Sequence, residues 1–546
     1  MARWEVVWHG LIYIAEEMGV ALRKTAVSPN IRDRLDFSCA VLDPDGVLVA
    51  QAEHIPVHLG SMAYAGTRVV EEAYRVYGGV GEGDVLATND PYIAGTHLND
   101  VMVVKPVYIS GRLAAWLACK AHHVDVGGPR PGSMNPEAST MLEEGFTLPL
   151  VKLVEGGRVR RDPLRILEAN TRTPRILAMD LHAQVAALSH GERLLRELAE
   201  RHGLERLEES MREAVDYVER YTRSMLGEYE GSSSAVDYVE ARSGAAEIRL
   251  RLSIGGGVAV LDYSGTSPQL PEPVNAVYGV TLAASTYALK SILDPGMPVN
   301  AGFYRAVEVR APEGSLLNPR PPAPVAAGNT ETSQRIVDVV YKALAGIPGL
   351  GDRVPAASGG TMTNVLLGGA DWAFYETVGC GSGGRPGLDG VDGVHVNMTN
   401  TLNTPIEVLE EEHPVVIERY ELRTGSGGLG EYRGGLGIVR AYRVLERVRL
   451  SVLMSRVLTA PWGLRGGEPG SPGRVVVVRR SGDVEEHPPS TTTVLEPGDI
   501  LYIETPGGGG YGDPCRRERR LIERDVEDGK YPGTVLRLWE RMCRGR

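Results

Sequence analysis

The chain has 546 residues, of which 42% are hydrophobic and 23% charged, a composition typical of a globular protein. Its net charge of −12 argues against general binding to nucleic acids or anionic membranes, because both require a basic face. At roughly 100–200 residues per domain, the length predicts two to four domains or one large core with lobes. The 67 glycines and 35 prolines indicate many turns and close backbone contacts.

No run of 18 or more uncharged apolar residues occurs, so we expect no membrane span. The start of the chain does not have the pattern of a signal peptide, and we expect a cytoplasmic protein. The five cysteines are scattered and form no CxxC, which indicates neither a disulfide framework nor a thiolate zinc site. Scarcity of Gln and Cys fits a thermophile, although GC-rich coding explains the excess of Arg over Lys equally well.

In the first part of the chain, apolar periodicity predicts alternating helices and strands. Apolar residues recur at helical spacing over 2–24 and again over 61–77. Residues 36–50 form a predicted hairpin around the turn sequence Asp43-Pro44-Asp45-Gly46. Residues 112–126 are almost continuously apolar, as expected of a strand that is buried on both faces.

The remaining periodicity completes a mixed fold. Residues 173–229 predict two long helices with a break near Gly203, and 234–265 predict antiparallel strands. Helices are expected at 276–293 and 334–346, strands over 415–505, and helices at the C-terminal end. We therefore expect an α+β, multi-lobed fold with largely antiparallel sheets. The expected boundaries are 1–164 (a lobe with the metal site), 165–230 (helical lobe), 231–414 (central α/β region), 415–514 (β-rich module) and 515–546 (helical tail).

Side chains of the types that can bind a metal are concentrated between residues 89 and 144. The candidate ligands are Asp90, His97, Asp100 and His122. Carboxylate oxygens and imidazole nitrogens together suit a divalent ion such as Mn, Fe or Zn. His97 and Asp100 are three residues apart, so a helical turn or a tight loop would direct both side chains to one side. The alternative is that these are polar loop residues and hydrogen-bonded buried histidines.

The pair His122 and His123 ends the predicted strand. In an extended chain the two rings point to opposite faces, so at most one of them binds the metal unless the strand bends there. The other would support the ligands or face the substrate. Lys120 shares the His122 face, and Asp125 shares the His123 face.

Two other groups have both a chemical and a structural interpretation. The segment 32–36 with His54 and His58 fits an ion-paired loop before a helix capped near Ser61. Alternatively, His54 or His58 lines the same pocket as the candidate ligands. Glu143 and Glu144 would supply a base or would be solvated surface acids.

Two glycine-rich segments formally match a functional motif, and one of them contains a cysteine. Residues 379–384 and 507–512 fit GxGxxG, but neither lies between a clear strand and a helix, which makes a dinucleotide site a weak interpretation. Cys380 in the first segment would be a nucleophile or, as is more frequent for a lone cysteine, a small buried hydrophobe. No GxxxxGK[ST] occurs.

Several longer segments are recognisable, and they run in order over about residues 2–530. They are 28–38 (SPNIRDRLDFS), 55–62 (IPVHLGSM), 89–100 (NDPY with GTHLND), 121–134 (AHHVDVGG with PGSM), 262–269, 328–335 (GNTETSQR), 426–435 and 505–513 (TPGGGGYGD). With these segments the chain resembles the hydantoinase B family. That family includes the matching half of 5-oxoprolinases and one subunit of the acetone and acetophenone carboxylases.

The resemblance implies a partner and a metal. Family members work with an A-type subunit of actin-like ATPase fold, which binds ATP and phosphorylates the substrate oxygen. The absence of a phosphate loop in this chain agrees with ATP being bound by the partner. Carried over by motif, the ligands of a divalent metal (Mn, Fe or Zn) are Asp90, His97, Asp100 and His122.

The function implied is that of the B-type subunit of an ATP-dependent cyclic-amide hydrolase, in a hetero-oligomer that opens hydantoins or 5-oxoproline. The metal would supply a water of lowered pKa to the activated amide. His123, Asp125 or His58 would move the proton. The alternatives are the metal-containing subunit of a carboxylase acting on a ketone, and a non-catalytic scaffold subunit.

Overall fold

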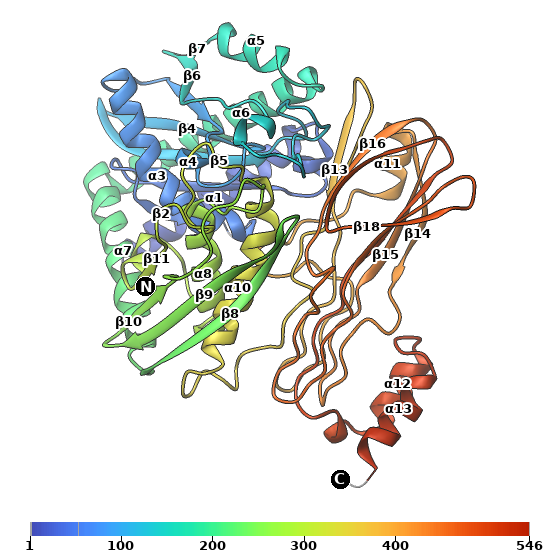
Figure 1. Cartoon of the computed structure of the whole chain (residues 1–546). Helices are drawn as coiled ribbons and strands as arrows, with labels where there is room; N and C mark the ends of the chain where they lie inside the picture. Colours follow the sequence, from blue (N-terminus) through green and yellow to red (C-terminus); the bar gives the residue numbers. More distant parts are fainter. Residues whose placement is uncertain (1–2, 53, 545–546) are drawn as a thin grey trace.

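The computed structural model describes residues 3–52 and 54–544. Two lobes lie side by side (Figure 1): a mixed lobe of helices and sheets formed by the first two thirds of the chain, and a lobe of sheets formed by the rest. Short helices at the C-terminal end lie beyond the second lobe. The mixture of helices with mainly antiparallel sheets confirms the predicted fold class.

A seven-stranded antiparallel sheet forms the centre of the first lobe, in the order β2-β1-β5-β4-β3-β6-β7. The predicted hairpin and the predicted buried strand are both present, although that strand ends at His122 instead of residue 126. The strands are β1 (Phe37–Leu42), β2 (Leu48–Gln51), β3 (Val85–Thr88), β4 (Asp100–Ile109), β5 (Arg112–His122), β6 (Val151–Glu155) and β7 (Arg158–Val159).

Helices cover both faces of this sheet. On one face α1 (Arg3–Thr25) packs along α6 (Pro174–His202), and on the other α3 (Pro56–Tyr77) packs against α8 (Tyr278–Leu293). α3 begins at Pro56 instead of residue 61, because proline is well suited to the first turn of a helix. Ser61 therefore lies inside α3, where its hydroxyl donates to the carbonyl of His58, and the predicted helix cap at Ser61 is wrong.

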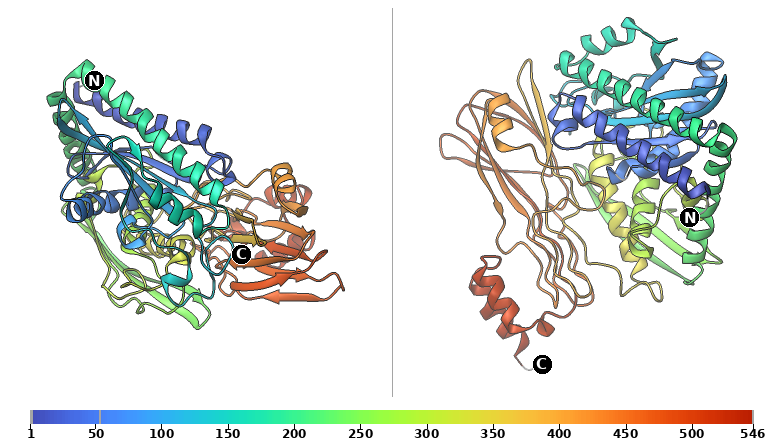
Figure 2. Two further views of the ribbon diagram at one scale, coloured as in Figure 1. Left: turned by 90° about the horizontal axis from the view of Figure 1, so that it is seen from above. Right: turned by 180° about the vertical axis from the view of Figure 1, so that it is seen from behind.

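The two predicted long helices are α6 and α7 (Leu204–Leu226), and the chain breaks between them at Gly203. Gly203 has φ +87°, which a residue with a side chain rarely adopts. Figure 2 shows α1 and α6 running side by side along the first lobe. Within the described residues, no helix is both long enough and apolar enough to cross a bilayer.

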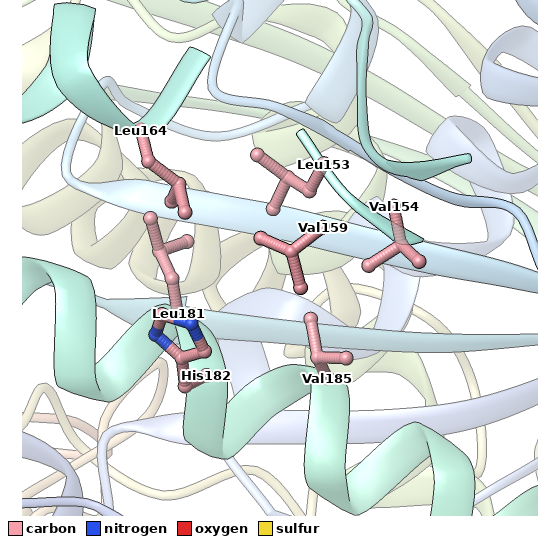
Figure 3. Close-up of a pocket in the computed structure, with 7 residues that line it drawn as sticks. All are labelled: Leu153, Val154, Val159, Leu164, Leu181, His182 and Val185. Carbon is pink, nitrogen blue, oxygen red and sulfur yellow. The ribbon is translucent and has the colours of Figure 1, made fainter. Parts of the chain in front are cut away.

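Apolar side chains hold α6 against the edge of the sheet. Leu153 and Val159 from β6 and β7, Leu164 from α5 (Arg161–Ala169), and Leu181 and Val185 from α6 point toward one another (Figure 3). The cavity between them measures about 20 Å³, room for about one water molecule, and its wall is apolar. We therefore interpret it as a packing defect and not as a ligand site.

A second sheet completes the first lobe, in the order β11-β10-β9-β8. The strands β8 (Gly231–Ala241), β9 (Gly244–Gly255) and β10 (Val258–Asp262) pair antiparallel as predicted, and β11 (Val307–Arg310) adds to β10 in parallel. α10 (Ser333–Leu344) packs across β8 and β9, and α9 (Ala301–Arg305) packs against α7. A π-helical turn, Gly328–Thr332, leads into α10.

The second lobe is a sandwich of two antiparallel sheets that share one apolar core. One sheet has the order β13-β12-β16-β19 and the other β14-β15-β20-β17-β18. Two of its strands come from the segment 364–377, before the predicted start of the β-rich module. The strands are β12 (Asn364–Gly368), β13 (Ala373–Thr377), β14 (Val415–Leu422), β15 (Ile438–Val444), β16 (Val448–Leu453), β17 (Arg474–Val478), β18 (Val484–His487), β19 (Ser490–Leu495) and β20 (Ile500–Glu504).

Glycine-rich segments pack backbone against backbone at one end of this sandwich. The amide of Gly435 donates to the carbonyl of Ser382 over 2.8 Å, and the amide of Gly508 donates to the carbonyl of Gly435 over 2.9 Å. A Cβ on Gly434 would lie 1.9 Å from the carbonyl oxygen of Gly508, so no side chain fits. We call residues 379–384, 426–437 and 505–512 the glycine layer. Both GxGxxG matches fall within it, and they pack the backbone.

Gly434→Ala should destabilise the protein by about 2–3 kcal/mol, the upper part of the usual cost of overpacking, because backbone atoms must move to admit the methyl group. Gly533→Ala is the matched control, since nothing lies within 4 Å of its added Cβ and its φ is ordinary. Urea unfolding of the two variants measures the difference. Equal midpoints for both would contradict the tight packing of the layer.

The C-terminal tail is helical, as predicted, and contains α12 (Arg519–Glu527) and α13 (Thr534–Cys543). A disulfide joins Cys515 to Cys543, a pairing that the scattered cysteines of the sequence do not indicate. The fold brings the two residues together because α13 returns to the segment before α12, where Trp539 Nε1 donates to the carbonyl of Pro514. Cysteine spacing contains no sign of this return.

Candidate metal centre

Three buried side chains meet in the seven-stranded sheet where β4 begins and β5 ends. Asp100 is the first residue of β4, His122 is the last residue of β5, and the two are direct partners across the antiparallel pair. His97 lies in the turn just before β4, where its carbonyl accepts from the amide of Asp100. One potential ligand atom from each of the three lies within 4.8 Å of the others. We call His97, Asp100 and His122 the triad.

The polar atoms of the triad fit a bound cation. All three residues are at most 2% exposed. Within the described residues, Nε2 of His97 and Nε2 of His122 have no hydrogen-bond partner, whereas His97 Nδ1 lies 3.1 Å from Asp100 Oδ2. Burying ring nitrogens without a partner is costly, and two imidazoles with a carboxylate are ordinary ligands of a divalent transition metal.

Neighbouring charges keep Asp100 ionised. Burial alone would raise its pKa, but His97 and His58 outweigh this and hold the pKa well below its usual value. His58 projects from α3, with its Nε2 3.3 Å from Asp100 Oδ2 and its Nδ1 3.1 Å from Ser38 Oγ. Of the two interpretations of His58, the structure supports the one in which it lines the same site.

His122 is oriented by groups on either side of its ring. Its Nδ1 lies 3.6 Å from Asp100 Oδ1 and 3.9 Å from Asp36 Oδ2. A carboxylate behind an imidazole is a frequent arrangement around metal ligands. The ring of Tyr375 stacks on His122 with centroids 4.4 Å apart and an interplanar angle of 6°.

Tyr375 connects the site to the second lobe. It lies on β13, its hydroxyl donates to Asn364 Oδ1 over 2.9 Å, and Asn364 Nδ2 donates to Glu331 Oε1 over 2.9 Å. Arg34 donates to the carbonyl of Tyr375 and to Thr377 Oγ1, and it is fully buried. The sandwich thus supplies one wall of the candidate metal centre.

The other predicted site residues lie around the triad without joining it. Asp90 caps the four-residue helix α4 (Pro91–Ala94), where its carboxylate accepts from the amide of Tyr92. His123 points toward α6, and its Nε2 lies 3.0 Å from Gln184 Oε1, as expected from its position opposite His122. Asp125 accepts from the amides of Gly127 and Gly132 and pairs with Arg172 at 3.0 Å. These bonds give Asp125 a clear role in holding its loop.

Glu144 and Cys380 are both buried. The carboxylate of Glu144 accepts from the amides of Val325 and Ala326, so the interpretation of Glu144 as a solvated surface acid is wrong. Burial raises its pKa to about 8. Burial also raises the pKa of Cys380 to about 12, which keeps it a thiol and agrees with a small buried hydrophobe.

Comparison with known proteins identifies the family of this chain. The sequence model of hydantoinase B/oxoprolinase matches residues 1–514. The chain belongs to this family. A protein of Methanocaldococcus jannaschii whose function is uncharacterised is 48% identical over 96% of this chain and 93% of its own length. The 5-oxoprolinase 1 of Arabidopsis thaliana is 37% identical over 92% of the chain, which spans 41% of that longer protein.

Two solved structures share the fold over nearly the whole chain. The ATP-dependent caprolactamase from Pseudomonas jessenii has a TM-score of 0.90 and 31% identity, covering 97% of this chain and 94% of the other. An acetone carboxylase in its nucleotide-free state also has a TM-score of 0.90, over 98% of this chain and 78% of the other. Its identity of 19% shows likeness of fold alone.

Proposed function

We propose that this chain is the metal-containing B-type subunit of an ATP-dependent cyclic-amide hydrolase. The observation that supports it most is the buried triad of two imidazoles and one carboxylate, in a chain that belongs to the hydantoinase B/oxoprolinase family. Relatives named for 5-oxoproline and caprolactam share the cyclic amide as the reacting group. We further propose that an A-type ATPase subunit binds ATP and activates the amide by phosphorylation.

In this proposal His97, Asp100 and His122 hold a divalent ion, Mn, Fe or Zn. Such an ion would act as a Lewis acid and would lower the pKa of a bound water toward neutral pH. Of the three predicted proton carriers, His58 has a described contact with a residue of the triad, Asp100. We therefore assign proton movement to His58. His123 and Asp125 support the surrounding structure through Gln184 and Arg172.

Reconstitution with the A-type partner tests the function. Cyclic-amide-dependent release of ADP, together with the ring-opened acid measured by mass spectrometry, is the expected result for hydantoin, 5-oxoproline or ε-caprolactam. Incorporation of labelled bicarbonate into acetone, without ring opening, would instead assign a carboxylase. A complex that retains full activity after His122→Ala would assign this chain a scaffold role.

A further inference from the structure

A second pocket lies outside the triad, between α1, the end of β2 and the loop 296–299. Its volume is about 530 Å³, within the range of roughly 300–1,000 Å³ usual for small-molecule sites. Trp8 and Ile12 from α1 and Val299 from the loop give it apolar walls. Walls of this kind with a few polar groups are the common composition of a ligand site.

One polar side chain in this pocket has no partner. Gln51, the last residue of β2, is 7% exposed, and within the described part of the chain neither its Nε2 nor its Oε1 forms a hydrogen bond. Glutamine is rare in this chain, with four in 546 residues, so a high glutamine content does not explain the buried position of Gln51. An unsatisfied buried amide costs about 1–3 kcal/mol, and a ligand that pairs with both atoms would remove this cost.

The rest of the pocket indicates an uncharged ligand. His54 also lines it, and its Nδ1 has no hydrogen-bond partner among the residues that the structure describes. Burial and the nearby His58 lower the pKa of His54 to about 4, so the ring is neutral at pH 7. The described lining also contains the acid Glu16 and the imidazole of His9, and neither Lys nor Arg occurs there. A phosphorylated or carboxylated ligand would find no permanently charged cation to pair with.

We infer that this pocket binds a neutral cyclic amide through the side-chain amide of Gln51. In a ring amide the N–H and C=O lie on the same edge, as they do in the glutamine side chain, so the two groups can exchange two antiparallel hydrogen bonds. An open-chain secondary amide is trans and points its N–H and C=O in opposite directions. The pocket would therefore favour a ring amide over an open-chain secondary amide.

This inference rests on the proposed function and adds to it a second site for an unreacted substrate without a charged group, such as ε-caprolactam or hydantoin, and not for 5-oxoproline, which carries a carboxylate. His54 of the pocket is close enough to His58 for His58 to lower its pKa, and His58 contacts Asp100 at 3.3 Å. The pocket shares no residue with the triad. It would hold the amide before phosphorylation, since its lining does not suit the charged intermediate.

Titration of the full chain with 2-pyrrolidinone, without partner or ATP, tests the inference by calorimetry or saturation-transfer NMR. N-methyl-2-pyrrolidinone keeps the ring and loses the N–H, and it should bind about 2–10-fold more weakly because one hydrogen bond is lost. The open-chain N-methylacetamide should also bind more weakly than 2-pyrrolidinone. Equal binding of 2-pyrrolidinone and its N-methyl analogue would overturn the proposed pairing.

Gln51→Leu removes both hydrogen-bonding atoms at similar volume and should weaken 2-pyrrolidinone binding by about 5–100-fold. Its thermal midpoint should be unchanged or higher, because no unpaired amide remains buried. Gln269→Leu, a glutamine outside this pocket that pairs with Arg320, is the matched control and should bind normally. Unchanged binding by Gln51→Leu would overturn the inference.

His97→Ala separates this inference from the proposed function. The variant should keep its affinity for 2-pyrrolidinone, because His97 does not line the pocket. Loss of binding in this variant would place the lactam at the triad and overturn the second site. Failure of ring opening in the reconstituted complex, with Gln51-dependent binding intact, would count against the proposed function alone.

Discussion

His97→Ala should abolish stable metal binding by the purified protein. In the proposed function His97 supplies one of three protein ligands from a buried position, and its removal leaves one imidazole and one carboxylate. Changing a residue that merely supports a ligand costs about 10–100-fold in metal affinity, so loss of a ligand should cost more than about 100-fold. Elemental analysis of protein purified without chelator gives the metal content, and ATP-dependent ring opening should fall with it.

Asp90→Asn is the matched control for this prediction. Asparagine caps a helix as well as aspartate does, so the variant keeps the bond to the amide of Tyr92 while removing the carboxylate that the sequence predicts as a ligand. Because Asp90 lies outside the triad, we expect the variant to keep its metal. Loss of metal in Asp90→Asn would return Asp90 to the ligand set, as the sequence predicts. Metal retained in full by His97→Ala would contradict the triad.

Asp338→Ala should lower the free energy of unfolding by about 3–5 kcal/mol, the usual cost of removing one partner from a buried ion pair. Asp338 on α10 lies 2.7 Å from Arg335 and 2.9 Å from Arg456, and all three are at most 2% exposed. Arg456 comes from the second lobe and also pairs with Asp237 on β8 at 3.2 Å. The substitution leaves two buried guanidinium groups with Asp237 and Glu240 as the nearby acids.

Asp352→Ala provides the matched control, because it also removes an aspartate from an Arg pair. The side chain of Asp352 is 91% exposed and lies 3.3 Å from Arg465, so water replaces the lost contact and the unfolding midpoint should not change. Guanidinium unfolding monitored by circular dichroism measures both variants. A loss below about 1 kcal/mol for Asp338→Ala would mean that the two lobes do not depend on this cluster.

The elements with strong periodicity could be predicted from the sequence, and those defined by distant partners could not. α1, α6 and α7 follow from apolar spacing, and Gly203 marks the break. The glycine layer has the same sequence signature as a nucleotide-binding loop, because both need a backbone without side chains. What distinguishes them is the neighbour: Gly508 packs against Ser382, which is more than a hundred residues away in the chain.

The candidate site shows the same division. His97, Asp100 and His122 could be predicted because donor residues cluster in the sequence and match the family motif. Asp36 reaches His122 through the register of β1 against β5, where Phe37 pairs with Ala121. Tyr375 reaches it because β13 of the sandwich docks on the first lobe. Neither Asp36 nor Tyr375 is close to a candidate ligand in the sequence, although the segment 32–36 is predicted to form an ion-paired loop.

The glycine layer also has a consequence for the synthesis of the chain on the ribosome. The amide of Gly509 donates to the carbonyl of Ala357, and the amide of Gly384 donates to the carbonyl of Gly509. The carbonyl of Ala357 and the amide of Gly384 therefore lack these partners until the segment around 509 has left the exit tunnel. Contacts between such distant segments form slowly. The first lobe can begin to fold during translation, whereas the second must wait and would be the part of the nascent chain that most needs a chaperone.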